Sequence, residues 1–141
     1  MRVYVLGSTS FVKEMVASVD KIKAAGHDGW IHPRYIDYAN DSDDIDFQRM
    51  MKGEAAKVKI DNDYLNDHYR NILASDAIFV VNQEKNGIAN YIGGNVLMEL
   101  GQAYVNKKKI FLLNPIPDMP YKDEIIAVKP VVIDGDFSKI N

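Results

Sequence analysis

The stretch from residue 77 to residue 114, "AIFVVNQEKNGIANYIGGNVLMELGQAYVNKKKIFLLN", decides the fold class. It begins and ends with short, nearly all-apolar runs, residues 77–82 and 109–114. Such runs are typical of strands that are covered on both faces, as in a parallel sheet. Between them, residues 90–103 carry apolar side chains at helical spacing and include two glycines, Gly93 and Gly94, near which the helix should start. Strand, loop, helix and strand in this order predict a right-handed β–α–β crossover.

The same alternation extends over the rest of the chain. Further strands are expected at residues 2–6, 29–32 and 131–133. Helices are expected after residue 10, over residues 45–58, after Asp61 and over residues 121–128, with an acidic loop at residues 37–46. In the helix after Asp61, the expected buried face consists of Leu65, Tyr69, Ile72 and Leu73. Five strands alternating with helices predict a single α/β domain over residues 1–141, a three-layer α/β/α sandwich with a flavodoxin-like, doubly wound parallel sheet.

Composition excludes several classes of function. The chain has 141 residues and a net charge of -3, which argues against a protein that tracks nucleic-acid phosphates. It has no cysteine, so disulfides, zinc–thiolate sites and thiol catalysis are excluded. The acidic run "DSDDID" lacks the glycine and the final glutamate of a calcium loop, and we expect neither a metal nor a cofactor. No apolar run has membrane-spanning length and none resembles a signal peptide, so we expect a cytoplasmic protein without a membrane partner.

In doubly wound sheets, ligands bind outside the carboxyl ends of the strands. Three loops follow strands at that edge, beginning at Gly7, at Asn82 and at Asn114. Backbone N–H groups at helix starts in such loops hold phosphates, carboxylates or sugar hydroxyls. The candidate binding residues are Gly7, Ser8, Asn82, Asn90, Tyr91, Gly93, Gly94, Asn95 and Asn114. Neither a P-loop nor a dinucleotide-binding glycine fingerprint is present.

Glu99 interrupts the apolar pattern of the helix expected within residues 90–103. If the buried stripe consists of Val96, Leu97, Leu100, Ala103 and Tyr104, Glu99 lies at its edge and is partly desolvated. One interpretation is a boundary glutamate with its stem on the core and its carboxylate in water. The other is a nucleophile or a general acid/base held in a cleft.

The motif "MELGQA" at residues 98–103, within "GGNVLMELGQAYVNKKKIFLL", resembles the nucleoside 2-deoxyribosyltransferase superfamily. That family includes N-glycosidases that act on deoxynucleoside 5′-monophosphates. The "GSTS" turn at residues 7–10 is similar to the family's opening turn. The resemblance implies that Glu99 is the nucleophile, which attacks the anomeric carbon and forms a glycosyl-enzyme ester that water or a second base resolves with retention.

Two positions depart from the family's pattern. Gly93 stands where the well-characterised transferases carry an aspartate, and His68 stands where they carry another acid. Asp67, Asp63 and His68 are the candidates for protonating the leaving base, and Asp67 is the one we pair with Glu99 as a catalytic residue. The structural interpretation of His68, a solvated or capping histidine, is preferred for that residue.

The expected function is cleavage or transfer at the N-glycosidic bond of a nucleoside or nucleotide, a small-molecule substrate. The resemblance also implies a homo-oligomer, in which a second copy of the chain completes the site. The alternative is a non-catalytic nucleotide-binding module on the same fold. A third interpretation is an FMN protein, because the first loop is rich in serine and threonine.

Overall fold

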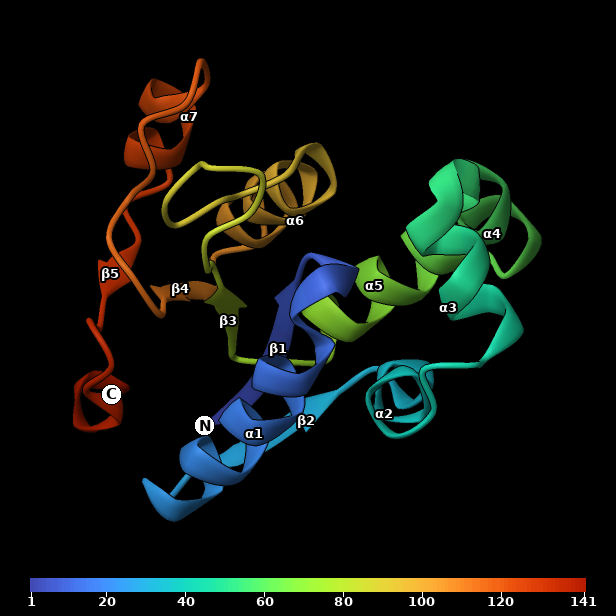
Figure 1. The fold of residues 1–141 in the computed structure, drawn as a ribbon. Coiled ribbons are helices and arrows are strands. Elements are labelled where there is room, and N and C mark those ends of the chain that lie inside the picture. Colours follow the sequence, from blue (N-terminus) through green and yellow to red (C-terminus); the bar gives the residue numbers. More distant parts are fainter.

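The centre of the fold is a five-stranded sheet in which all strands are parallel, with the order β2-β1-β3-β4-β5 (Figure 1). The computed structural model describes residues 1–141. The strands are β1 (Arg2–Gly7), β2 (Asp28–Ile31), β3 (Ala77–Val81), β4 (Lys109–Leu112) and β5 (Val131–Val132). From β1 the strand order first runs to β2 on one side and then to β3, β4 and β5 on the other, which makes the sheet doubly wound and confirms the predicted flavodoxin-like α/β sandwich.

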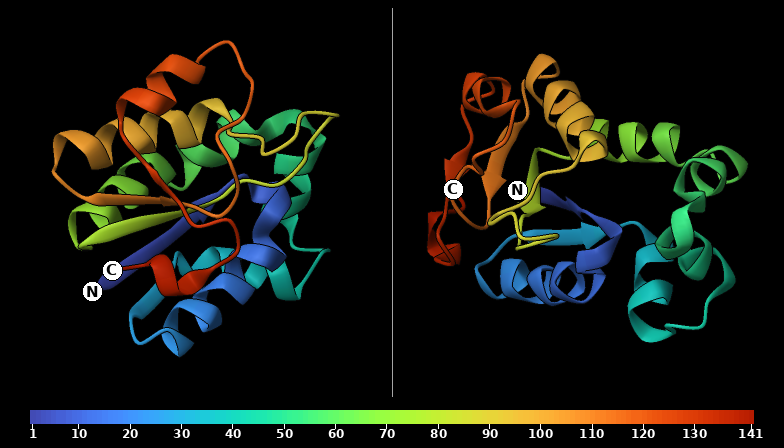
Figure 2. Two further views of the ribbon diagram at one scale, coloured as in Figure 1. Left: turned by 90° about the vertical axis from the view of Figure 1, so that its left-hand side faces the viewer. Right: turned by 45° about the horizontal axis from the view of Figure 1, so that its top comes forward.

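Helices cover both faces of the sheet (Figure 2). One face carries α1 (Val12–Ala24) and α2 (Pro33–Asn40), and the other carries α5 (Tyr64–Leu73), α6 (Gly94–Val105) and α7 (Lys122–Ala127). The helices α3 (Ile45–Arg49) and α4 (Ala55–Asp61) lie to one side of the sheet (Figure 1). None of these helices has both the length and the apolar character needed to cross a bilayer.

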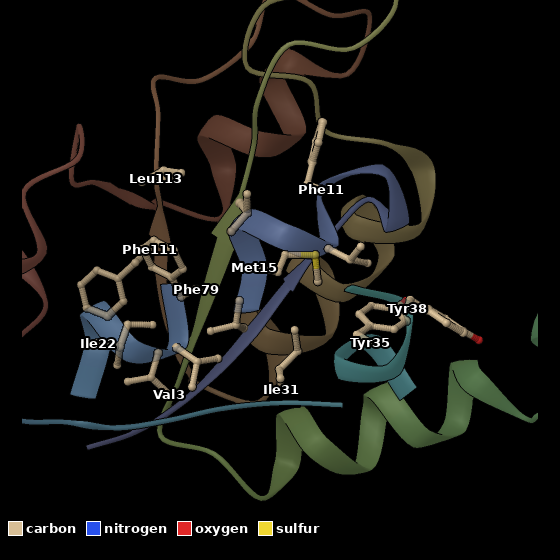
Figure 3. Packing of buried hydrophobic residues seen from close by; sticks show 14 of the residues in the cluster. Val3, Phe11, Met15, Ile22, Ile31, Tyr35, Tyr38, Phe79, Phe111 and Leu113 are labelled. Carbon is tan, nitrogen blue, oxygen red and sulfur yellow. The ribbon is translucent and has the colours of Figure 1, made fainter. Parts of the chain in front are cut away.

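The two faces of the sheet bury separate hydrophobic layers, because successive strand residues point to opposite faces. On β1, Val3 and Val5 pack toward α1, where Figure 3 shows Met15 and Ile22 against the sheet. Tyr4, on the same strand, belongs to the other layer, with α5 and α6. β3 is buried at every position, as expected for a central strand of a parallel sheet.

The predicted loop at residues 37–46 is wrong in its first part, because α2 occupies Pro33–Asn40. Pro33 stands in the first turn, where a helix tolerates proline, and the His32 ring accepts a hydrogen bond from the Arg34 amide at 3.2 Å. The predicted helix over residues 45–58 is interrupted. A π-helical turn (Met50–Glu54) separates α3 from α4, and Gly53 has a φ of 92° that breaks the helical path.

The predicted buried face of α5 is confirmed at Ile72 and wrong at its other three residues. Its buried residues are Tyr64, His68 and Ile72, and the helix begins at Tyr64 rather than directly after Asp61. Leu65, Tyr69 and Leu73 point to solvent. His68 is 3% exposed, which contradicts the expectation of a solvated or capping histidine.

The buried stripe of α6 is displaced in the same way. It consists of Val96, Glu99, Leu100 and Ala103, whereas Tyr104 is 47% exposed. Glu99, expected at the edge of the stripe, lies within it and is 4% exposed.

Candidate functional site

A cavity of about 190 Å³ opens at the carboxyl edge of β1 and β3. Its walls come from the loop after β1, from Tyr35 on α2, from the segment joining α3 to α4, and from the loop before α6. This volume is below the roughly 300–1,000 Å³ of pockets that enclose a drug-sized ligand. The cavity therefore has room for a group about the size of a sugar ring.

Six of the predicted binding residues line this cavity: Gly7, Ser8, Tyr91, Gly93, Gly94 and Asn95. They come from two loops that are about 80 residues apart in sequence and meet because β1 and β3 are neighbours in the sheet. Gly7 is required at the contact between the strands, since a Cβ there would lie 2.8 Å from the Val81 carbonyl oxygen.

Asn82, Asn90 and Asn114 lie away from this cavity, in a clamp that joins two loops. The Asn82 amide oxygen accepts from the Asn114 backbone N–H at 2.9 Å, and its Nδ2 donates to the carbonyl oxygen of Asn114 at 3.0 Å. Nδ2 also donates to the carbonyl of Asn90 at 3.4 Å, and the Asn114 side chain donates to the Asn82 carbonyl at 2.9 Å. Asn82 is fully buried. Its hydrogen-bonding capacity is therefore used within the protein.

Glu99 lies behind the cavity wall, one helical turn after Asn95. The Asn95 Nδ2 donates to the Glu99 Oε1 at 2.6 Å, and no Lys or Arg forms an ion pair with this carboxyl group. Burial raises the pKa of Glu99 to about 8, against the opposing effects of the Lys59 charge and the Asn95 hydrogen bond. A carboxyl group in this setting exchanges its proton near neutral pH.

Two lysines flank the cavity. The Lys85 Nζ donates to the Ser8 Oγ at 3.0 Å and lies 5.3 Å from the centre of the Tyr91 ring. Lys59, on α4, also lines the cavity and lowers the pKa of Glu99 through its charge. The cavity therefore combines two ammonium groups and the N-terminus of α6, all of which favour an anionic ligand.

A buried hydrogen-bond network lies beside Glu99. The Tyr4 hydroxyl and the His68 Nδ1 are 2.6 Å apart, and the Tyr35 hydroxyl and the His68 Nε2 are 3.2 Å apart. Burial, followed by the charge of His32, lowers the pKa of His68 to about 4, so the ring is neutral at physiological pH. Burial and then the negative charge of Glu99 raise the pKa of Tyr35.

Asp67 is engaged elsewhere. Its Oδ2 accepts from the His32 Nε2 at 3.1 Å and its Oδ1 accepts from Arg70. Burial acts to raise the pKa of Asp67, but the hydrogen bonds from His32 and Arg70 prevail and lower it. Asp67 does not line the cavity. It is therefore an ionised carboxylate in a local pair, rather than a proton donor beside Glu99.

Sequence reasoning missed Tyr35 and Lys59 as cavity residues. The signal for Tyr35 was present, because a histidine followed by proline starts a helix when the histidine caps it, and Tyr35 and Tyr38 are then three residues apart on one face. Figure 3 shows these two rings side by side on α2. Lys59 had no comparable signal, since its position depends on the break at Gly53.

Comparisons of the chain with models of known protein families, with curated proteins and with solved structures found no match. The fold and the cavity are therefore the observations from which a function is inferred.

Proposed function

We propose that this protein cleaves or transfers the N-glycosidic bond of a nucleoside or of its 5′-monophosphate, with Glu99 as the nucleophile. The observation that carries the proposal is a carboxyl group buried without an ion pair behind a sugar-sized cavity at the ligand-binding edge of the sheet. Burial of an unpaired carboxylate opposes folding. A role in chemistry accounts for its presence there.

The reaction proceeds in two displacements. The Glu99 carboxylate bonds to the anomeric carbon, and the electron pair of the C–N bond leaves with the base. Water then attacks the same carbon, its hydroxyl stays on the sugar, its proton goes to the base, and the carboxylate is released. A second base in place of water gives transfer. Covalent capture divides one difficult step into two easier ones.

Ligand binding has two tasks before this chemistry. The first is to move the Asn95 side chain, which donates to Glu99 and forms the wall in front of it. The second is to keep Glu99 ionised, which the nearby Lys59 charge favours. Ser8 and Lys85 line the cavity with a hydroxyl and an ammonium group 3.0 Å apart, and these are the groups that would bind a 5′-phosphate.

The test is incubation of the purified protein with deoxy- and ribonucleosides and their 5′-monophosphates, with release of free base followed by chromatography. Glu99→Gln keeps the shape of the side chain and the acceptor for Asn95 but removes the nucleophile. Release by the wild type that falls by at least about 1,000-fold in Glu99→Gln supports the proposal. Release that persists in Glu99→Gln contradicts it.

A second candidate function is nucleotide binding without catalysis. The observation that favours it is the raised pKa of Glu99, which keeps the carboxyl group protonated at neutral pH in the absence of ligand. A nucleotide that raises the melting temperature of both wild type and Glu99→Gln equally, with no base released, would support this alternative.

We also propose that copies of this chain associate through the outer surface of α5 and α6. Leu65, Tyr69 and Leu73 form an exposed row on α5, with Met98 and Val105 exposed on α6. The surface adjoins the site, because Asn95 borders both the cavity and the hollow lined by Leu65 and Met98. Sedimentation of the wild type as an oligomer, and of Leu65→Lys as a monomer, is the expected result, whereas a monomeric wild type contradicts the proposal.

A further inference from the structure

None of the acidic side chains considered for assisting departure of the base is placed to do so. Asp67 is paired with His32 and Arg70, and Asp63 is exposed outside the cavity. Both ring nitrogens of His68 are used by tyrosine hydroxyls. The donor must therefore be sought among the protic side chains that form the cavity wall.

Counting the protons in the buried network shows which group donates in each of its hydrogen bonds. The Asn71 Nδ2 donates to the Tyr4 oxygen at 3.3 Å, and Tyr4 is fully buried. If the His68 Nδ1 also donated to Tyr4, the Tyr4 proton would have no acceptor, at a cost of about 1–3 kcal/mol. Tyr4 therefore donates to Nδ1, which fixes the tautomer of the neutral ring.

The same tautomer decides what Tyr35 does. With Nδ1 as acceptor, the His68 Nε2–H donates to the Tyr35 oxygen, at 3.2 Å. The proton of Tyr35 is thus left for an acceptor in the cavity that Tyr35 lines.

We propose that the Tyr35 hydroxyl donates a hydrogen bond to the leaving base, and that His68, held by Tyr4, is the positioning residue that directs it. This inference rests on the proposed function. The leaving nitrogen is bonded to the carbon that Glu99 attacks, and Tyr35 lines the same cavity as Asn95, the side chain that donates to Glu99, so a base bound in this cavity lies beside Tyr35. As the C–N bond breaks, its electron pair moves onto the base, and Tyr35 stabilises the developing charge while keeping its own proton. The attacking water later supplies the proton of the neutral base.

The experiment compares Tyr35→Phe with Tyr38→Phe. Both substitutions remove one buried hydroxyl from α2, but Tyr38 bonds to Tyr64 at 2.6 Å and does not line the cavity. Base release is measured for two substrates with the same sugar, one with an ordinary base and one with a better leaving group, such as guanine against N7-methylguanine or uracil against 5-fluorouracil. Circular dichroism and thermal unfolding report whether each variant is folded.

The expected result is a loss of about 100-fold in kcat/KM for Tyr35→Phe on the ordinary base, and of less than about threefold on the better leaving group. His68→Gln should show the same dependence on the leaving group, and Tyr38→Phe should stay within about twofold of the wild type on both. If Tyr35→Phe loses the same factor in kcat/KM on both substrates, or loses none, the role of Tyr35 is overturned while the proposed function stands. A wild type that releases no base from any substrate overturns the proposed function as well, so the two failures are distinguishable.

Discussion

Replacing Glu99 by glutamine should stabilise the protein, and increasingly so as the pH rises. The native fold raises the pKa of Glu99 from 4.5 to about 8, chiefly by burial, whereas the unfolded chain exposes the carboxyl group to water. Between these two values the native state holds a proton that the unfolded state has lost. Unfolding therefore releases a proton, and the stability of the wild type falls as the pH rises through this window. Glutamine does not titrate and escapes this loss.

The magnitude follows from the same two values. A difference of one in pKa corresponds to about 1.4 kcal/mol, so ionised Glu99 costs about 5 kcal/mol at pH values above 8. At pH 7, where most native molecules still hold the proton, the cost is about 3 kcal/mol, and at pH 5 it is about 1 kcal/mol. Such differences are large beside the roughly 5–15 kcal/mol by which native proteins are stable.

The assay is urea unfolding of the wild type and Glu99→Gln at pH 5, 7 and 8.5, with Asp20→Asn as a control for loss of an exposed carboxylate. The free-energy difference between Glu99→Gln and the wild type should grow by about 4 kcal/mol from pH 5 to pH 8.5. Asp20→Asn should differ from the wild type by less than about 0.5 kcal/mol throughout. A constant difference for Glu99→Gln would show that the carboxyl group is solvated in the native state, which refutes the reasoning.

Three further predictions concern the reaction and the frame of the site. Because the attack requires ionised Glu99, the rate of base release at low substrate concentration should rise up to tenfold per pH unit below about pH 8 and level off above it. A rate that falls as the pH rises from 6 to 8 contradicts this role of Glu99. Gly7→Ala should lower the free energy of unfolding by about 1–3 kcal/mol, because its Cβ meets a backbone oxygen at 2.8 Å, while Gly94→Ala, with open space around it, should be nearly neutral in urea unfolding. Asn82→Ala leaves the Asn114 N–H unpaired and should lower the free energy of unfolding by about 2–3 kcal/mol, as followed by thermal unfolding. An unchanged melting temperature would mean that water replaces the hydrogen bonds of the Asn82 side chain.

The strands and the ligand edge were predictable from sequence because they depend on local patterns. Apolar runs of strand length, interrupted by glycine and asparagine, specify a buried parallel sheet with little help from tertiary contacts. Once the strands are known, the rule for doubly wound sheets places the loops at Gly7 and at Gly93 on one edge. Their meeting in one cavity follows from the pairing of β1 with β3.

The helix α2 was not predictable by the same route. Proline is usually a sign that a regular element ends, and Pro33 does follow β2 closely. The structure uses it to begin a helix, with the ring of His32 as the cap. Missing this helix removed Tyr35 from the predicted site, although its neighbours in space were correctly placed on the edge of the sheet.

The errors on α5 and α6 share one cause, which is that ionisable residues occupy buried positions on these two neighbouring helices. On α5 the apolar pattern selects Leu65, Tyr69 and Leu73, yet His68 is buried instead, and on α6 Glu99 is buried while Tyr104 is exposed. Apolar side chains at these positions would favour folding more than a neutral histidine and a carboxyl group do. Burying polar groups and exposing apolar ones lowers the stability of the fold on both helices. Buried polar groups of this kind are expected at a functional site, and exposed apolar groups are expected at a surface that a second copy covers. The places where the hydrophobic pattern fails therefore point to the same region as the cavity.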